Sequence, residues 1–385
     1  SKLANPALAG SKRSRSAISA GSSVTGIGPV VSMDPMITPI GLRNQARRQL
    51  TPSREGAISC TREATVEFSK DVLKLDLPAE ADRIVAFIRD QLKWMHRKGI
   101  VIGLSGGVDS ALAAALSVEA VGKDKVLGLL LPDKESSPQS AEFASKHAAA
   151  LGIETILVDI TPVLEAFGTY EKRDAVVRSV FPEYGPGYGM KITLPPDVLN
   201  KDSLNFFTLT VVDPGGAAHT VRLSPDQAQG IIAATCTKHR TRMMTQYYHA
   251  ERLNYLVCGT TNKSEALQGL FVKYGDGGVD IEPIAHLFKT QVRALAAHMG
   301  VIPEIVGRPP CPDTYSAPVT DEEWYFRMPF EQLDLLLYAW EAKVPLPEIA
   351  RVMGLAEDQI KRAFRDFTSK HNTTEHLRQF PPSLG

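Results

Sequence analysis

The chain has 385 residues, in which 43 lysines and arginines balance 43 aspartates and glutamates. This length can bury one large core or two ordinary ones. The balanced charge argues against proteins that depend on nucleic-acid or membrane electrostatics, so we expect neither partner and look for a local ligand site instead.

The cysteines and the hydropathy pattern favour the cytoplasm. Cys60, Cys236, Cys258 and Cys311 stand apart from one another, without the close pairs typical of structural zinc or dithiol redox sites. No stretch approaches the roughly 18 apolar residues of a membrane span, and no apolar run follows the first basic residues as in a secretory signal. We therefore expect a cytoplasmic protein.

Residues 1–64 have the composition of an extension rather than a domain. They are rich in Ser, Ala, Gly and Pro, and residues 1–60 contain eight lysines or arginines against two acidic residues. Such a segment buries little apolar surface, so we expect a flexible basic extension followed by one domain over residues 65–385. A remnant of an expression vector and a mitochondrial transit peptide are the alternatives.

Helix and strand patterns alternate through the next hundred residues. An amphipathic helix is predicted over 80–98, where apolar residues recur every three or four positions. The patterns that follow are a strand at 100–104, a glycine loop, a helix at 111–121, a strand at 126–131, a helix at 140–151 and a strand at 155–159. This alternation predicts a doubly wound parallel α/β sheet, with ligands at the carboxyl ends of its strands.

Residues 168–233 interrupt the alternation and are expected to form an insertion. Strand-like runs at 205–212 and 220–223 flank a Pro-Gly-Gly turn, which predicts a hairpin. The sheet resumes at 253–259, and the chain beyond Lys289 is predicted to be mostly helical.

The C-terminal stretch 346–367 has the outline of a helix-turn-helix, with Gly354 between two helical patterns. Six basic and five acidic residues lie between Glu341 and Lys370. A DNA reader would need an excess of basic charge. We therefore expect these helices to pack against the core.

The loop Leu104-Ser-Gly-Gly-Val-Asp-Ser110 carries the first chemical signal. It joins a strand to a helix, where backbone amides and a helix N-terminus can hold phosphate. It is not a Walker A loop, because Asp109 replaces the lysine, and that carboxylate suits a polyphosphate only if Mg²⁺ bridges the two. Ser105 and Ser110 add hydroxyl donors. The alternative is an ordinary strand-to-helix turn in which Asp109 favours the helix dipole.

A second block begins where a strand ends at Gly259. Thr260 offers a hydroxyl there, and Glu265 supplies a second carboxylate. Two carboxylates from different βα turns could share one metal across a bound triphosphate. Lysines and aspartates follow around a glycine-rich turn at 273–280, and Lys289 comes shortly after. For any one of these charges, a solvated surface turn is the alternative.

Arg240 lies in the cationic run Lys238-His-Arg-Thr-Arg-Met-Met244. Arginine can hold a phosphate through two parallel hydrogen bonds, so this run suits a phosphate-rich ligand. A helix with basic side chains extended along its surface is an equal alternative.

The loop Ser105–Ser110 resembles the signature of the N-type ATP pyrophosphatases, which cleave ATP between the α and β phosphates and adenylate a substrate. The block from Gly259 to Ile281, with its Lys-Tyr-Gly-Asp-Gly segment, resembles the NAD synthetases of that superfamily. The similarity runs from about Phe68 to the C-terminus. It implies an adenine nucleotide alpha hydrolase-like fold, with ATP and Mg²⁺ as cofactors.

The resemblance also implies roles for particular residues. Asp109, Glu265 and Lys289 would be catalytic, with Asp109 and Glu265 as Mg²⁺ ligands. The residues implied to contact ATP are Gly103, Ser105, Gly106, Gly107, Asp109, Ser110, Thr260, Lys289 and Cys311. Those implied to bind nicotinic acid adenine dinucleotide are Arg240, Lys273, Asp280 and His376, the last closing over the site.

The sequence departs from the family pattern at four places. Cys311 stands where a Thr or Ser usually contacts ATP, Leu377 replaces a common lysine after His376, and Cys236 replaces a frequent Asn near Arg240. The insertion is longer than the corresponding loop of the small ammonia-using enzymes. These departures put the identity of the carboxylate substrate in doubt, not the ATP chemistry.

We therefore expect a ligase that amidates nicotinic acid adenine dinucleotide through an acyl adenylate, giving NAD, AMP and pyrophosphate. A fused amidase domain would need roughly 100 residues or more before Phe68, so free ammonia or a separate glutaminase is expected to supply the nitrogen. The resemblance implies a homodimer. The alternatives are the same chemistry on another carboxylate and a non-catalytic nucleotide-binding regulator; GMP synthesis and tRNA thiolation fit less well.

Overall fold

The computed structural model describes residues 67–384. The chain divides into two units, Ser1–Glu63 and Ala64–Gly385. The expected N-terminal extension, with Cys60, lies outside the described residues, and the description below concerns the second unit.

A four-stranded parallel sheet lies at the centre, in the order β3-β2-β1-β7. The strands are β1 (Ile100–Gly103), β2 (Val126–Leu130), β3 (Glu154–Leu157) and β7 (Leu256–Cys258). Their side chains alternate between two separate cores: Ile100 and Ile102 of β1 join one, whereas Val101 joins the other. Because both faces need an apolar cover, β1, β2 and β7 are continuous apolar runs, whereas β3 at the edge of the sheet is mostly exposed.

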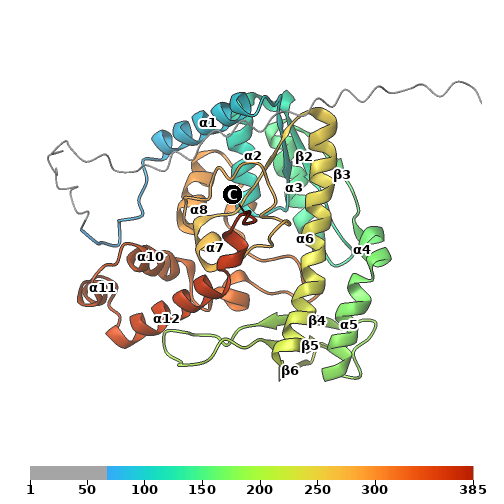
Figure 1. Cartoon of the computed structure of the whole chain (residues 1–385), viewed down its shortest axis with the longest axis vertical. Coiled ribbons are helices and arrows are strands. Elements are labelled where there is room, and N and C mark those ends of the chain that lie inside the picture. The colour runs from blue at the N-terminus through green and yellow to red at the C-terminus, as the bar shows by residue number, and fades with distance from the viewer. Residues whose placement is uncertain (1–66, 385) are drawn as a thin grey trace, which may run out of the picture. The chain divides into compact units, whose positions relative to one another are not determined.

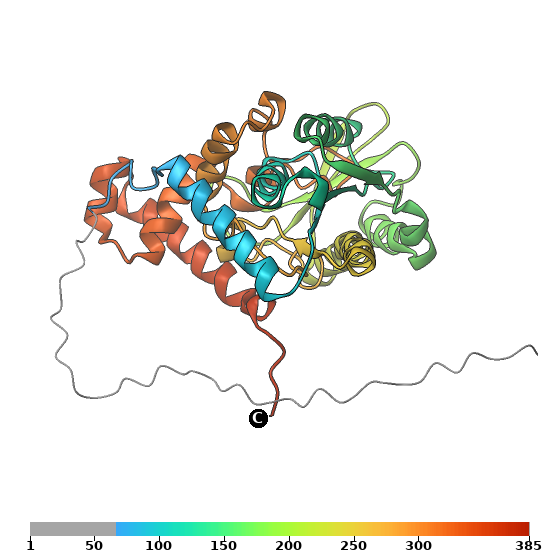
Figure 2. The same ribbon diagram turned by 90° about the horizontal axis from the view of Figure 1, so that it is seen from above.

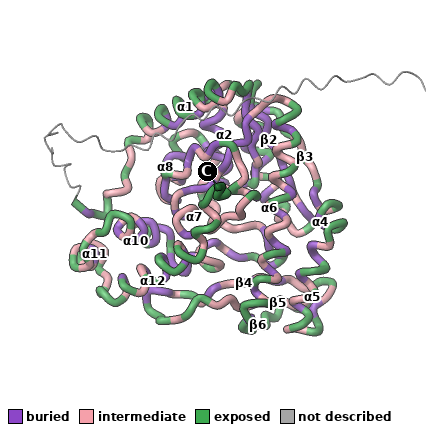
Figure 3. Tube along the Cα trace, in the orientation of Figure 1, coloured by how far each residue is buried: buried purple, intermediate pink, exposed green. Residues whose placement is uncertain are grey.

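Helices cover both faces of this sheet, which confirms the doubly wound prediction. One face carries α2 (Val108–Val121) and α3 (Pro138–Leu151), with α1 (Leu77–Trp94) and α8 (Lys289–His298) packed outside α2. The other face carries α4 (Thr161–Phe167) and the long helix α6 (Pro225–Leu253). Figure 3 shows the buried segments concentrated in α2 and the central strands.

Two predicted boundaries were wrong for local reasons. The first helix begins at Leu77 rather than at 80, because Asp76 caps it by accepting a hydrogen bond from the Ala79 amide. It ends at Trp94, and His96 then takes a left-handed backbone conformation. Strand β7 starts later than predicted because α6 continues to Leu253 and ends on Asn254, which is also left-handed.

The insertion contains a second, antiparallel sheet in the order β4-β5-β6. Its strands are β4 (Gly189–Thr193), β5 (Thr208–Val212) and β6 (Ala218–Arg222). The predicted hairpin is confirmed, with β5 and β6 paired from Thr208↔Arg222 to Val212↔Ala218. The sequence did not reveal β4, which follows a Pro- and Gly-rich stretch, nor α5 (Thr169–Val180), which packs on α6.

The chain beyond the parallel sheet is mostly helical, as predicted. Its helices are α7 (Lys263–Gln268), α8, α9 (Pro303–Val306), α10 (Phe330–Glu341), α11 (Leu346–Met353), α12 (Glu357–Thr373) and α13 (Glu375–Arg378). Ile349 of α11 and Ile360 and Phe367 of α12 are fully buried in a core of their own. In both views these C-terminal helices gather on the side of the parallel sheet opposite α4 and α5 (Figures 1 and 2).

The order of the strands reverses between β1 and β7, which lie side by side. The chain runs outward from β1 to β2 and β3, and then returns to add β7 on the other side of β1. Ligands of open α/β sheets bind outside the carboxyl ends of the strands at such a reversal. Within residues 67–384, no helix is both long and apolar enough to cross a membrane.

Candidate active site

The glycine loop connects β1 to α2 and is held by its own hydroxyl groups. The Ser105 and Ser110 Oγ atoms lie 3.1 Å apart, and the Ser110 hydroxyl donates to the Gly107 carbonyl at 3.1 Å. The Gly107 amide donates to Ser105 Oγ at 3.3 Å. Ser110 is buried whereas Ser105 is exposed at the N-terminus of α2. The loop is therefore a preformed turn with its open side at a helix N-terminus, where an anion is stabilised.

Gly106 is required at this turn for two reasons. Its φ of +76° lies in the left-handed region. A Cβ atom built there would lie 2.3 Å from the Ser140 carbonyl oxygen of α3. The close approach between the loop and α3 therefore depends on the absence of a side chain. Gly103 is less restrictive, since its Cβ would lie 3.4 Å from the Gln246 side-chain amide.

The second loop follows β7 and ends in a capping box at the start of α7. The Asn262 side chain accepts from the Glu265 amide at 3.0 Å, and the Glu265 carboxylate accepts from the Asn262 amide at 3.3 Å. This box fixes Glu265 in the first turn of the helix. Thr260 lies half-buried just before it.

Lys289 brings the two carboxylates together. Its Nζ atom lies 2.6 Å from Asp109 Oδ2 and 3.2 Å from Glu265 Oε1. The lysine side chain is 3% exposed, and those of Asp109 and Glu265 are 16% and 17% exposed. The structure thus joins the three residues predicted to be catalytic, from the starts of α2, α7 and α8.

Burial and charge act in opposite directions on this cluster. Burial raises the pKa of Glu265 to about 8, although Lys289 lowers it. Burial would lower the pKa of Lys289, but Asp109 and Glu265 outweigh it and raise that pKa. We conclude that Lys289 is charged and that its ammonium lies between the two carboxyl groups, of which Glu265 holds a proton more readily than an ordinary glutamate.

Sequence reasoning missed three polar residues that support the cluster. Asn262 donates from Nδ2 to Asp109 Oδ1 at 2.9 Å, so one amide positions both carboxylates. Asp334 of α10 accepts from the Ser264 hydroxyl at 2.6 Å and from the Thr290 amide at 2.8 Å. It thereby ties the first turns of α7 and α8 together. The signal for Asp334 in the sequence is a lone acid within an otherwise apolar helix face.

A third acid, Asp321, also faces the cluster. It is buried, and burial raises its pKa to about 6, with Lys289 acting in the opposite direction and Asp109 in the same one. It precedes the short π-helical turn Glu322–Phe326, a segment in which the sequence offers no motif.

The cluster fits a hard divalent cation only in part. Two carboxylates that converge on one ammonium offer the oxygen ligands that Mg²⁺ prefers. Across residues 67–384, no group of three or more His, Cys, Asp or Glu side chains is placed to hold a metal. Further ligands would have to come from water and phosphate, as is usual for Mg²⁺ in nucleotide sites.

Three of the four predicted substrate residues lie together. Arg240 is exposed on α6 and donates to the Lys273 carbonyl at 3.4 Å. The Lys273 ammonium donates to the His376 and Gln379 carbonyls at 2.9 and 2.8 Å. The C-terminal segment with His376 is therefore held at the Lys273 turn.

The fourth predicted substrate residue, Asp280, forms hydrogen bonds with other partners. Its carboxylate accepts from the Val257 amide at 2.8 Å and from the Tyr247 hydroxyl at 3.1 Å. These bonds attach the turn to β7 and α6, so Asp280 shapes the end of the sheet while it remains exposed.

Cys311 is half-buried in the segment that follows α9. Burial raises the pKa of its thiol, and the nearby Arg308 only partly offsets that effect. A thiol that stays protonated is a weak nucleophile. The three described cysteines, Cys236, Cys258 and Cys311, are free.

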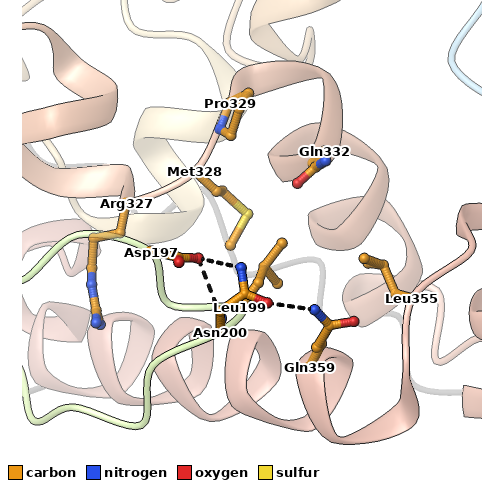
Figure 4. A pocket seen from close by; sticks show the side chains of 9 residues that line it. All are labelled: Asp197, Leu199, Asn200, Arg327, Met328, Pro329, Gln332, Leu355 and Gln359. Atoms are coloured by element: carbon orange, nitrogen blue, oxygen red, sulfur yellow. Dashed lines mark hydrogen bonds between the residues drawn. The ribbon is translucent and has the colours of Figure 1, made fainter.

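A separate cavity lies between the insertion and the C-terminal helices (Figure 4). It has a volume of about 470 Å³, and its lining contains no residue predicted for the site. Its polar groups bond to one another: Asn200 donates to Asp197 at 2.8 Å, and Gln359 donates to Asn200 at 2.8 Å (Figure 4). The residues predicted for the site lie instead around the loops that follow β1 and β7.

Known proteins resemble this chain over most of its length. A family model described as NAD synthase matches residues 80–180 and 206–381. The chain is similar to a protein of Rhizobium meliloti named NH(3)-dependent NAD(+) synthetase, with 45% identity over 314 residues that cover 82% of this chain and 94% of the other. A protein of the same name from Mesorhizobium japonicum is 47% identical over 311 residues, covering 80% and 97%.

A solved structure shares the fold. That of NMN synthetase from Francisella tularensis has a TM-score of 0.55 and 23% identity, covering 81% of this chain and 99% of that one. At this identity the likeness supports the architecture alone. The family model skips residues 181–205, which include β4, so this part of the insertion is outside the common pattern.

Proposed function

This chain belongs to the NAD synthase family, and from that premise we propose that it amidates nicotinic acid adenine dinucleotide with ammonia and ATP, giving NAD, AMP and pyrophosphate. The observation that carries the proposal is the Lys289 cluster at the N-terminus of α2. It places one cation and two carboxylates beside a preformed phosphate loop. The two relatives described above, both named NH(3)-dependent NAD(+) synthetase, support the choice of nitrogen donor.

The first step activates the carboxylate of the substrate. A free carboxylate is a poor electrophile at neutral pH, so one of its oxygens attacks the α-phosphorus of ATP. The bond from the α-phosphorus to the pyrophosphate oxygen breaks, and an acyl adenylate forms. Amides of the glycine loop, the Ser105 and Ser110 hydroxyls and Lys289 would stabilise the charge that grows on the pyrophosphate.

Asp109 and Glu265 would hold Mg²⁺ in this site. When bound, the metal would neutralise part of the phosphate charge. The two side chains supply part of the donor set, since both already converge on a cation, and oxygens of water and phosphate would complete it. The Lys289 ammonium occupies that position between them in the described structure, so it acts as the balancing charge.

The second step forms the amide. Ammonia attacks the carbonyl carbon of the adenylate, the C–O bond to AMP breaks, and AMP leaves with the oxygen that came from the carboxylate. No side chain needs to form a covalent bond, which agrees with the protonated state of Cys311. The ammonia comes from solution or from a separate glutaminase.

The dinucleotide would lie against Arg240, Lys273 and His376. Arg240 can hold a phosphate through its two-pronged guanidinium. Within residues 67–384 its only hydrogen bond is a long one of 3.4 Å to the Lys273 carbonyl, so the guanidinium can exchange that bond for a phosphate without leaving a buried charge unpaired. Asp280 completes the turn from the other side.

We assign a homodimer and a cytoplasmic setting to the same proposal. Met244 and Tyr248, one turn apart on α6, are 55% and 63% exposed, and Arg240 lies one further turn along. Such an apolar strip beside a predicted substrate residue suits a subunit interface. The free cysteines suit a reducing compartment.

Amidation of another carboxylate is the alternative. It is favoured by residues 181–205, which the family model skips. This alternative uses the same adenylation by ATP and the same attack by ammonia, and it differs only in the carboxylate that is adenylated.

One assay tests the proposal. Purified protein with MgATP, ammonium and nicotinic acid adenine dinucleotide should give NAD, AMP and pyrophosphate in equal amounts. AMP without NAD when other carboxylates are supplied would favour the alternative acceptor. Formation of ADP would contradict adenylation.

A further inference from the structure

Arg308 reaches the glycine loop from a segment that carries no recognised motif. It follows α9, and its NH2 atom donates to Ser140 Oγ of α3 at 3.0 Å. Its NH1 atom lies 3.4 Å from the Gly106 carbonyl, the length of a weak hydrogen bond. The guanidinium also lies over the Phe143 ring, 5.8 Å from its centroid. It thus lies between the loop and the first turn of α3.

This is an unfavourable place for a cation that has no partner. The N-termini of α2 and α3 carry partial positive charge. In the part of the chain that the structure describes, no carboxylate forms an ion pair with Arg308, whereas Lys289 has two. At the start of α3 the Asp313 carboxylate accepts from the Ser137 amide at 3.0 Å, but it forms no ion pair with Arg308, so the guanidinium charge remains for a ligand at the loop.

We propose that Arg308 binds the β and γ phosphates of ATP and holds the pyrophosphate as it leaves. The planar guanidinium can take two phosphate oxygens at once, and its hydrogen bonds to Ser140 Oγ and the Gly106 carbonyl are to neutral oxygens that a charged phosphate can replace. The assignment rests on the proposed function for its reaction. During adenylation the α-phosphorus gains the carboxylate oxygen and loses the pyrophosphate oxygen, and the charge released on that oxygen lies toward the loop and Arg308.

Arg308 and Lys289 have different roles in this proposal. Lys289 is balanced by Asp109 and Glu265, so it organises the metal site. Arg308 keeps its full charge for the ligand. It therefore acts on the part of ATP that AMP lacks.

Binding of ATP and of AMP to Arg308→Gln tests this directly. Isothermal titration should show ATP affinity lowered roughly 10- to 100-fold, the loss expected for charged hydrogen bonds, with AMP affinity changed less than about twofold. Arg308→Lys keeps the positive charge but lacks the planar guanidinium that can bind two oxygens. Its ATP affinity should therefore lie between those of the wild type and of Arg308→Gln.

Arg89→Gln is the matched control. Arg89 donates to the Ala120 and Glu119 carbonyls at 2.7 and 2.8 Å, at the opposite end of the same helix α2. This variant should keep the wild-type ratio of ATP to AMP affinity. Equal weakening of ATP and AMP in Arg308→Gln would overturn the proposal, because it would show that Arg308 only shapes the loop; unchanged ATP affinity would overturn it as well.

The two proposals can fail separately. The titrations need no dinucleotide and no turnover, so they report on Arg308 even if the wild type forms no NAD. Selective loss of ATP affinity in a protein without NAD synthesis would uphold the phosphate contact and contradict the proposed reaction.

Discussion

Lys289 determines the electrostatics of the site more than any other residue. It is 3% exposed and contacts two half-buried carboxyl groups from separate loops. Removal of one partner from a buried ion pair leaves uncompensated charge, which costs more than the pair itself contributes. We therefore expect Lys289 to contribute both to the stability of the fold and to the reaction.

Replacement of Lys289 by Met should lower the free energy of unfolding by about 3–5 kcal/mol and abolish NAD formation. Urea unfolding provides the measurement. Lys263→Met is the control, because its pair with Glu341 is more exposed, at 24% and 44%, and should cost less than about 1 kcal/mol.

The double variant Lys289→Met/Asp109→Asn separates the two roles of the cluster. It should recover part of the stability, since one of the two facing charges is removed, but no activity. A Lys289→Met protein as stable as the Lys263→Met control would contradict this account.

Glu282 gives the fold a dependence on pH. It accepts from the Thr261 amide and hydroxyl, both at 3.1 Å, beneath the second loop. Burial raises its pKa from 4.5 to about 8, against the effect of those two bonds. The folded protein therefore keeps a proton that the unfolded chain loses, and stability falls as pH rises between those values.

The variant Glu282→Gln should remove this dependence. Its unfolding free energy should match that of the wild type near pH 5 and exceed it at pH 8, with a slope difference of up to about 1.4 kcal/mol per pH unit. Both the urea midpoint and the slope with denaturant should be followed across this range. If the difference in unfolding free energy between the wild type and Glu282→Gln grew as the pH fell, the assignment would be refuted.

At the scale of elements, the site depends on close contacts between helix starts. The first turns of α2, α7 and α8 supply Asp109, Glu265 and Lys289, and Asp334 of α10 holds two of these turns in place. The glycine loop lies against α3 at a distance that only glycine permits.

Two glycines at opposite ends of α2 make a matched test of that contact. Gly106 and Gly122 have φ values of +76° and +82°, but a Cβ would meet the Ser140 carbonyl only at Gly106, and open space at Gly122. Gly122→Ala should cost about 1 kcal/mol of backbone strain. Gly106→Ala should cost about 1–3 kcal/mol more and weaken ATP binding. Thermal unfolding and ATP titration would check both, and equal effects would argue against the role of the α3 contact.

The elements also show what sequence can predict. Apolar runs that alternate with helical patterns predicted the parallel sheet, and parallel strands end at one edge, so Asp109 and Glu265 could be expected to meet. Asn262, Asp334 and Arg308 could not be predicted, because their partners come from segments far away in the chain. Strand β4 was missed because Gly and Pro precede it and its partner β5 is not a tight-turn neighbour.

At the scale of the whole molecule, the insertion is joined to the C-terminal helices. Arg327 is buried with a left-handed backbone and donates to Asn205 at 2.7 Å and to Asp366 of α12 at 3.1 Å. Arg362 of α12 donates to the Leu199 carbonyl at 2.9 Å. Residues outside the family model thus brace the helix that leads to His376, which links the insertion mechanically to the substrate end of the site.

In this account a carboxylate oxygen becomes bonded to the α-phosphorus before the nitrogen arrives, and AMP keeps that oxygen when ammonia displaces it. Nicotinic acid adenine dinucleotide labelled with ¹⁸O at both carboxylate oxygens tests that claim most directly. With MgATP and ammonium, mass spectrometry should find one ¹⁸O in NAD and one in the phosphate of AMP, with none in pyrophosphate. Unlabelled AMP, or label in pyrophosphate, would contradict the acyl adenylate.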